Sequence, residues 1–282
     1  MERIAWESLP GDLVRAIEHH SGPILTAHVA TAGQNSPLAA TITTAEGKTF
    51  VKGLPSSERQ AKSQTREIAV APLVRDISPQ LLWHFDQAGW IVLGYEYIEG
   101  RHADYRPGSS DLDSLVSVLK TLGGIDVSDP GPFKLAEDRW KSYVQDPDTL
   151  KVFSGTTLQH TDWLPDNVLF TSSRPYLIDW AWPTLGAAWM DPAFWLVRLI
   201  ASGHTIKAAE QYAAQVPGYA NADPTHINLF ALANVQLWDE IEQQATKVSP
   251  WVRSLATASR EWCEFRSRDR RTWSNATSPP TG

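Results

Sequence analysis

Hydrophobic residues in the first part of the chain occur in short runs separated by polar turns, a pattern typical of β-strands. Polar turns lie at residues 46–48 and 86–89. Helical spacing is restricted there to residues 12–20 and 57–76, and Pro72 is expected to kink or end the second helix. The pattern predicts an antiparallel meander of strands at residues 24–30, 38–43 and 49–54, and two more strands at 81–85 and 90–98.

Beyond Gly100 the hydrophobic spacing changes to that of α-helices. One helix face is marked by Leu112, Leu115, Leu119 and Leu122. Further stripes predict helices at residues 136–144, 192–201, 206–214, 227–244 and 252–268, interrupted by loops and short strands at 158–183. We therefore expect an α+β, two-lobed chain. Its parts would be a β-rich lobe at residues 1–97, a larger mainly helical lobe at 98–273 and a disordered tail at 274–282.

Composition limits the partners that this chain is expected to have. Its 282 residues carry a formal net charge of −7 without a strongly basic face, so nucleic acid is not an expected partner. The single cysteine, Cys263, cannot build a disulfide framework or a thiolate zinc site. Residues 1–10 carry Glu2, Arg3 and Glu7 and no apolar core, and no stretch approaches about 18 uninterrupted apolar residues. We expect a cytoplasmic protein without a membrane span, and these patterns favour no oligomeric state.

Candidate chemistry lies in the segment between the helices, which reads HTDWLPDNVLF at residues 160–170 and YLIDW at 176–180. Asn167 follows Asp162 by five residues, the spacing of the catalytic aspartate and the asparagine in kinases. Phosphoryl transfer needs a group that orients a hydroxyl and takes its proton, and hard oxygen ligands for Mg²⁺. Asp162 suits the first role. Asn167 and Asp179, on a predicted hairpin, suit the second.

These strings resemble the aminoglycoside phosphotransferase family, which shares the protein-kinase-like fold. The usual family form is His-Gly-Asp, two variable residues, Pro, one more residue and Asn, followed later by Ile-Asp-Trp or Ile-Asp-Phe. The resemblance implies that Asp162 is the catalytic base and that Asn167 and Asp179 bind Mg²⁺. It also implies that His160 braces the loop. At Thr161 glycine is usual, so the backbone there must adopt a conformation open to threonine.

The resemblance also implies nucleotide-binding residues in the β-rich lobe. Lys52, on the third predicted strand, is expected to contact the α- and β-phosphates and to pair with Glu67 of the following helix. Lys48 is the alternative to Lys52, but it falls at a turn. The alternative for Lys52 and Glu67 is a surface lysine and a solvated helix face.

Two further positions are expected to meet the nucleotide through backbone groups. Gly33 and Ser36 lie at the place of the phosphate-covering loop, where N–H groups can face phosphate oxygens. A plain hairpin turn is the alternative for that loop. Glu96 and Ile98 lie at the connector between the lobes, whose main chain binds the base in this fold, and an ordinary strand end is the alternative there.

The helical lobe holds the candidates for the acceptor substrate. Trp163 adjoins the proposed base and is a candidate floor for the acceptor. Asp239, Glu240 and Glu242 form an acidic cluster of the kind with which members of this family meet substrate ammonium groups. A solvated helix face is the alternative. Asp191, in a stretch similar to the family's Gly-Asp-Pro-Ala, is interpreted as structural.

The resemblance implies an enzyme that transfers the γ-phosphoryl group of ATP or GTP, with Mg²⁺, to a hydroxyl of a small molecule. An aminoglycoside or another antibiotic is a natural acceptor, so antibiotic resistance is one expected role, beside biosynthesis and metabolism. A catalytically silent nucleotide-binding module is the main alternative, and the intact set of reactive residues argues against it. A metal hydrolase would need further ligands with convincing spacing. A protein kinase would need Asp-Phe-Gly and Ala-Pro-Glu segments.

Overall fold

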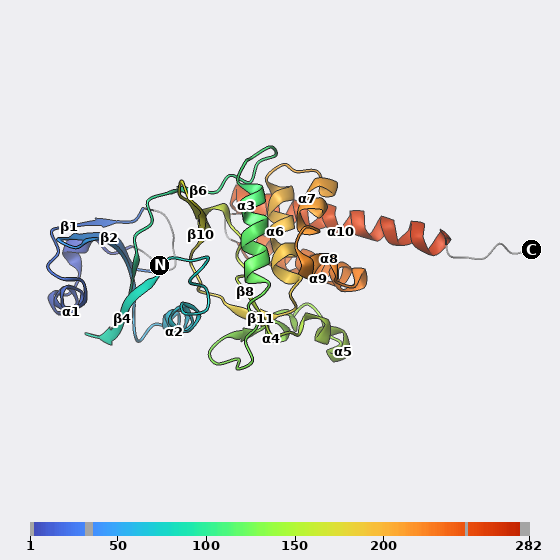
Figure 1. Cartoon of the computed structure of the whole chain (residues 1–282). Helices are drawn as coiled ribbons and strands as arrows, with labels where there is room; N and C mark the ends of the chain where they lie inside the picture. The colour runs from blue at the N-terminus through green and yellow to red at the C-terminus, as the bar shows by residue number, and fades with distance from the viewer. Residues whose placement is uncertain (1–2, 32–35, 246–247, 277–282) are drawn as a thin grey trace, which may run out of the picture. The chain divides into compact units, whose positions relative to one another are not determined.

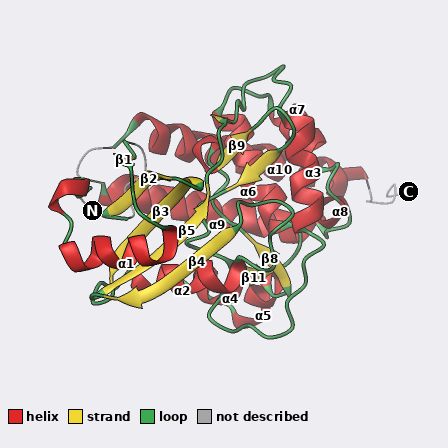
Figure 2. Ribbon diagram, turned by 60° about the vertical axis from the view of Figure 1, so that its left-hand side comes forward, coloured by secondary structure: helices red, strands yellow, loops and turns green. Residues whose placement is uncertain are grey.

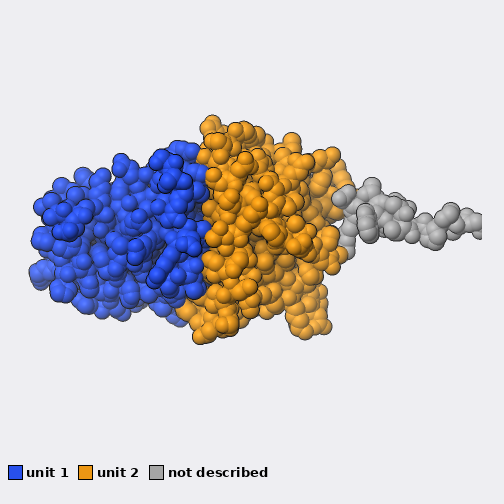
Figure 3. All heavy atoms as spheres, viewed as in Figure 1, with its two compact units in different colours: residues 1–102, 167–183 blue, residues 103–166, 184–282 orange. Residues whose placement is uncertain are grey.

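The structure is a computed structural model that describes residues 3–31, 36–245 and 248–276. It divides into two compact units, coloured separately in Figure 3. Unit 1 contains residues 1–102 and 167–183, and unit 2 contains residues 103–166 and 184–282. None of the described helices is both long and apolar enough to cross a membrane.

Unit 1 is built on a five-stranded antiparallel sheet with the order β1-β2-β3-β5-β4, visible as arrows in Figure 2. A tight turn at Ala88 and Gly89, both with positive φ, joins the last two strands in chain order. The five predicted strands are therefore present, but β5 lies beside β3 and leaves β4 at the edge. The strands are β1 (Thr26–Val29), β2 (Leu38–Thr44), β3 (Gly47–Pro55), β4 (Leu81–Gln87) and β5 (Trp90–Glu96).

Two helices accompany this sheet, α1 (Gly11–Ser21) and α2 (Ala61–Val70). Leu13 and Ile17 of α1 are fully buried in the cluster that also holds core residues of β2, β3 and β5. The second helix is shorter than the predicted 57–76. It ends before Pro72, which has no N–H to continue the helix, while Ala71 keeps helical φ and ψ and its N–H donates to the carbonyl of Glu67.

Residues 167–183 belong to unit 1, whereas the sequence-based boundary at 97/98 assigned them to the helical lobe. The reason is a second, small sheet with the order β10-β9-β6. In it β9 (Val168–Phe170) pairs with β10 (Pro175–Leu177) and with β6 (Arg101–His102). The backbone N–H of Leu177 also donates to the carbonyl of Ile77, at 2.6 Å. Such pairing between distant segments leaves no local mark in the sequence.

Unit 2 is mainly helical, and most of its helices were predicted within a few residues (Figure 1). The helix expected at 136–144 is shorter, and the one expected at 252–268 is longer. A small sheet with the order β7-β11-β8 lies among them, formed by β7 (Lys134–Leu135), β8 (Thr157–Gln159) and β11 (Thr184–Gly186). The helices are α3 (Leu112–Leu122), α4 (Ala136–Trp140), α5 (Pro147–Leu150), α6 (Met190–Ala201), α7 (Ile206–Ala213), α8 (Pro217–Ala220), α9 (Pro224–Gln244) and α10 (Pro250–Ala276). The predicted tail at 274–282 thus overlaps the end of α10, and residues 277–282 lie outside the described residues.

Aromatic side chains form much of the core of unit 2. Trp140 of α4 stacks on Phe153 with ring centroids 5.5 Å apart and meets Phe230 of α9 edge-on at 5.1 Å. Helix α6 is buried along most of its length, so its sequence is apolar on nearly every side. The predicted α+β class, with a strand-rich part and a mainly helical part, is confirmed.

Candidate functional site

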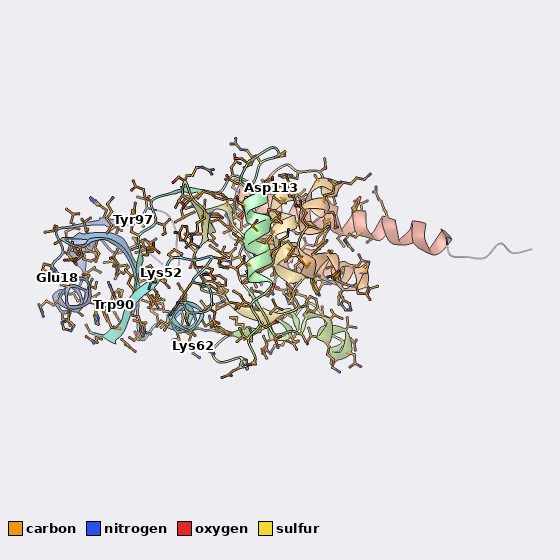
Figure 4. The ribbon with its side chains drawn as sticks, viewed as in Figure 1. Glu18, Lys52, Lys62, Trp90, Tyr97 and Asp113 are labelled. Carbon is orange, nitrogen blue, oxygen red and sulfur yellow. The ribbon has the colours of Figure 1, made fainter. Side chains whose placement is uncertain are left out.

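Lys52 is the centre of a charged cluster in unit 1. It lies on β3 opposite Ala39 and Leu93 and is labelled on the sheet in Figure 4. Its Nζ atom lies 2.9 Å from Glu67 Oε1 and 2.7 Å from Asp179 Oδ1. The Lys52 side chain is 12% exposed and that of Glu67 only 2%. The pairing of Lys52 with Glu67 agrees with the sequence-based expectation, and the same ammonium also reaches Asp179.

Burial and pairing oppose each other in this cluster. Burial disfavours the charge of Lys52, but Asp179 and Glu67 raise the pKa of its ammonium above the ordinary value. Burial raises the pKa of the Glu67 carboxyl, while Lys52 acts against that rise. The hydroxyl of Tyr95 on β5 donates to Glu67 Oε2 at 3.2 Å. Glu67 is therefore held from two directions, by a cation and by a phenol.

Asn167 and Asp179 flank the β9–β10 hairpin. Asn167 ends a short 3₁₀ turn (Pro165–Asn167), and its carbonyl accepts from the N–H of Ile178 at 2.8 Å. Asp179 has a φ of 63°, a left-handed conformation that is unusual for a residue with a side chain. The hairpin thus joins the backbones of the two proposed ligands. An amide oxygen and a carboxylate form a hard donor set that fits Mg²⁺.

The segment after Asp179 is anchored within unit 1. The indole N–H of Trp180 donates to Ser78 Oγ at 2.7 Å, and that hydroxyl donates to the carbonyl of Leu177. Strained backbone conformations persist where surrounding contacts hold them. These hydrogen bonds therefore fix the turn in which Asp179 adopts its positive φ.

The other proposed nucleotide-binding positions also lie in unit 1. Gly33 lies outside the described residues. Ser36 is buried, and its carbonyl accepts from the guanidinium of Arg3. Glu96 ends β5, and its N–H donates to the carbonyl of Gln80 at 2.9 Å. Ile98 follows in an irregular, half-buried stretch. Residues 97–100 after β5 have no regular secondary structure.

The loop of Asp162 belongs to unit 2, and the carboxylate of Asp191 binds its backbone. The Asp191 carboxylate accepts from the N–H of His160 at 2.6 Å and from the N–H of Thr161 at 2.8 Å. Burial raises the pKa of Asp191, and His160 and these backbone donors oppose the rise. The N–H of Asp162 lies 3.3 Å from Nδ1 of His160, which places the imidazole inside the loop. The contacts of Asp191 are therefore those of a residue that holds the loop in its conformation.

Thr161 stands at the position where the resembled family has glycine. Its φ is 70°, a value that costs a threonine more than a glycine. Its hydroxyl receives a hydrogen bond from Arg139 at 2.6 Å, and the same guanidinium nitrogen donates to Thr184 at 2.8 Å. The side chain that makes the conformation costly is therefore also the one that ties the loop to α4.

Asp162 is the partly open member of this loop, with 38% of its side chain exposed. Its Oδ1 lies 3.4 Å from an η nitrogen of Arg198 on α6, a side chain only 10% exposed. Trp163, the proposed floor of an acceptor site, is fully buried and lies edge-on to His160 with centroids 6.2 Å apart. That position favours a packing role for Trp163 over contact with a substrate.

The acidic cluster on α9 has partners inside unit 2. Asp239 and Glu242 both contact Arg260 of α10, at 2.6 and 2.7 Å. Glu240 accepts from the hydroxyl of Tyr143 at 2.7 Å, and burial together with Glu240 raises the pKa of that phenol to about 12. Since Arg260 balances two of the three acids, this cluster is less suited to an ammonium ligand than its sequence suggests.

Besides Arg260 and Tyr143 at the acidic cluster and Arg3 at Ser36, sequence reasoning missed three polar side chains that contact the Lys52 cluster and the loop of Asp162. They are Tyr95 at Glu67, Arg139 at Thr161 and Arg198 at Asp162. No spacing or motif marks them, because each lies on an element whose own pattern only reports a strand or a helix. One sequence signal could have been used: Arg198 is an arginine in an otherwise apolar helix, and the structure shows that it is buried.

The fold is that of small-molecule kinases with known structures. A choline kinase, LicA from Streptococcus pneumoniae, superposes with a TM-score of 0.62 at 14% identity, over 90% of this chain and 98% of that one. An aminoglycoside phosphotransferase from Alicyclobacillus acidocaldarius subsp. acidocaldarius gives 0.64 at 12% identity, over 95% and 99%. A spectinomycin phosphotransferase solved with ADP and spectinomycin gives 0.54 at 15% identity, over 91% and 97%. By sequence, no family model and no curated protein matches this chain.

Proposed function

We propose that this chain is a phosphotransferase that moves the γ-phosphoryl group of ATP or GTP to a hydroxyl of a small molecule, with Mg²⁺. The observation that carries the proposal is the contact of Lys52 with both Glu67 and Asp179. Lys52 and Asp179 are 127 residues apart in sequence. A lysine, a helix glutamate and a metal-binding aspartate are the recurring parts of kinase phosphate sites.

The nucleotide side of the reaction is assigned to unit 1. Lys52, held by Glu67, would neutralise phosphate oxygens, and backbone groups near Ser36, Glu96 and Ile98 would bind the rest of the nucleotide. Asn167 and Asp179 would hold Mg²⁺, which supplies charge neutralisation on the phosphates when bound. Gly33 stays a proposed position in the loop before Ser36.

The acceptor side is assigned to Asp162. Its carboxylate would accept a hydrogen bond from the substrate hydroxyl and take that proton as the new O–P bond forms. The bond between the γ-phosphorus and the bridging oxygen breaks, and the nucleoside diphosphate leaves. His160 and Asp191 would keep the loop in place. The complete set of base, lysine and metal ligands favours catalysis over a silent nucleotide-binding module.

The acceptor is proposed to be a hydroxylated small molecule, with nucleotide as the other partner. The similar structures include a choline kinase and a spectinomycin phosphotransferase, so amino-alcohols and aminocyclitol antibiotics belong in a first panel. We place the enzyme in the cytoplasm, where ATP and GTP are available. A resistance role would follow only from an antibiotic acceptor.

A phosphate-transfer screen tests this function. The purified chain is incubated with Mg²⁺ and ATP or GTP and a panel of hydroxylated compounds, and products are detected by mass. We expect one class of compound to gain a phosphoryl group. The Asp162→Ala variant should bind ATP with unchanged affinity and transfer nothing. Mg²⁺-dependent nucleotide binding without transfer to any compound would support the silent module instead.

A further inference from the structure

Arg198 lies inside unit 2, next to the proposed base Asp162. It is on α6, in the only polar position of the stretch from Phe194 to Ala201. The residue is 9% exposed, and an η nitrogen lies 3.4 Å from Asp162 Oδ1. Charge-assisted hydrogen bonds are usually about 2.7–2.9 Å long, so this pair is oriented but not tightly closed.

The buried guanidinium of Arg198 does not use all of its hydrogen-bond donors. Its Nη1 atom is buried and has no hydrogen-bond partner among the described residues. Its carbon lies 5.2 Å from the centroid of the Trp238 ring on α9, a cation–π contact. Burial lowers the pKa of Arg198, with Asp162 and Tyr105 opposing the change, but arginine stays protonated in proteins. A buried charge with an unmet donor is costly, so a compensating use is expected.

Contact with the acceptor is not that use. The unmet Nη1 atom is closed off from solvent, so a substrate cannot reach it in this structure. Asp162, by contrast, is the exposed partner of the pair. A rigid cation beside an exposed carboxylate restricts the carboxylate's rotation.

We propose that Arg198 is a positioning residue, which holds the Asp162 carboxylate in the orientation needed to receive the hydroxyl proton. The inference rests on the proposed function and adds a residue that carries none of its motifs. Because α6 is buried along most of its length and Trp238 covers the guanidinium face, Arg198 is itself held in place. The base is therefore aligned by the packed interior of unit 2 and not only by its own loop.

Steady-state kinetics of Arg198→Met and Arg198→Lys test the proposal, with Mg²⁺, ATP and the best acceptor from the screen. A misplacement of about 1 Å can cost on the order of 100-fold in rate, so we expect kcat of Arg198→Met to fall roughly 10- to 100-fold. The KM for ATP should stay within about twofold, because the nucleotide residues belong to unit 1. Arg198→Lys should recover part of kcat. Arg253→Met, an exposed arginine of α10, is the matched control and should retain full activity.

A second measurement is independent of catalysis. Melting temperatures are compared for wild type, Asp162→Asn, Arg198→Met and the double variant. If the pair is coupled, the double variant melts above the value obtained by adding the two single shifts. Additive shifts would overturn the inference, and so would an Arg198→Met variant with full kcat. A wild-type chain that transfers phosphate to no acceptor would instead refute the proposed function.

Discussion

A buried cation lies beside a carboxylate in each unit, and the two cations are paired very differently. Lys52 in unit 1 meets two carboxylates at 2.9 and 2.7 Å. Arg198 in unit 2 meets Asp162 at 3.4 Å and keeps a buried donor without a partner among the described residues. Lys52 is thus closely surrounded by charge, while Arg198 is loosely paired.

The difference matches two tasks of the proposed phosphotransfer. In that proposal Lys52, presented by β3 and paired with Glu67, would bind phosphate oxygens. A base that must receive a proton needs an accessible carboxylate whose orientation is restricted but whose oxygens are not fully engaged by strong donors. The tight cluster of unit 1 suits binding, and the loose pair of unit 2 suits proton transfer.

The largest expected effect separates the two carboxylates that face these cations. Asp162→Asn should lower kcat on the order of 10²- to 10⁴-fold, the usual contribution of a general base, with little change in nucleotide affinity. Asp179→Asn should lower both kcat and Mg²⁺-dependent ATP affinity, because it removes a proposed metal ligand and a Lys52 partner. Titration calorimetry with ATP and Mg²⁺ beside kinetics checks the split. Equal effects of both variants on ATP affinity would break the comparison.

Removing Lys52 is expected to destabilise unit 1. In Lys52→Met the Glu67 carboxylate keeps Tyr95 but loses its cation, and breaking a buried pair in this way costs about 3 kcal/mol. Urea unfolding measures the change in the free energy of unfolding. Lys62→Met is the control, since Lys62 is an exposed lysine of α2, the helix that carries Glu67. A Lys52→Met variant as stable as the control would show that the cluster is not coupled to folding.

The same variant should depend more steeply on pH. Burial raises the pKa of Glu67, and removing Lys52 removes the main opposing influence. The unfolded chain ionises this carboxyl near pH 4.3, so the unfolded state gains relative stability as pH rises from about 4.3 towards the raised folded pKa. Lys52→Met should therefore lose stability relative to wild type as pH rises above about 4.3. The double variant Lys52→Met/Glu67→Gln should remove this extra slope, and parallel profiles for Lys52→Met and wild type would contradict it.

The smallest effect is expected at Thr161 in the loop of unit 2. Glycine would relieve the cost of a φ of 70°, about 1 kcal/mol, but would lose the hydrogen bond from Arg139, which is of similar size. Thr161→Gly should therefore change the free energy of unfolding by less than about 1 kcal/mol. Thr161→Val keeps the conformational cost and loses the bond, so it should be the less stable of the two. The reverse order would mean that the positive φ of Thr161 carries no conformational cost, because both variants lose the hydrogen bond from Arg139.

Much of the strand-rich part could be predicted because its signals are local. Apolar alternation and polar turns reported five strands, and the strand position of Lys52 followed from them. The strand order could not be predicted, because β4 pairs at the edge only after a long connection through α2. The sequence also could not show that residues 167–183 group with unit 1, because their place depends on the pairing of β9 with the distant strand β6.

The candidate site divides in the same way. Asp162, Asn167 and Asp179 stand in one segment with kinase-like spacing, so the sequence alone is enough to propose them as base and metal ligands. The acidic cluster of α9 was also legible, but its balance by Arg260 was not, since that arginine is 21 residues from Asp239 and on another helix. Which charges remain available is a property of packing.

The sequence by itself determined which chemical groups this protein carries and where strands and helices form, because those depend on residue type and on neighbours a few positions away. The tertiary structure alone decided which charges meet. Lys52 reaches Asp179 across 127 residues, and Arg198 reaches Asp162 across 36. Electrostatic interaction depends on distance and burial in three dimensions, and neither is written in sequence spacing. Arg198 is the clearest case. In the sequence it is one polar position in an apolar helix, and only the fold places it beside the carboxylate of Asp162.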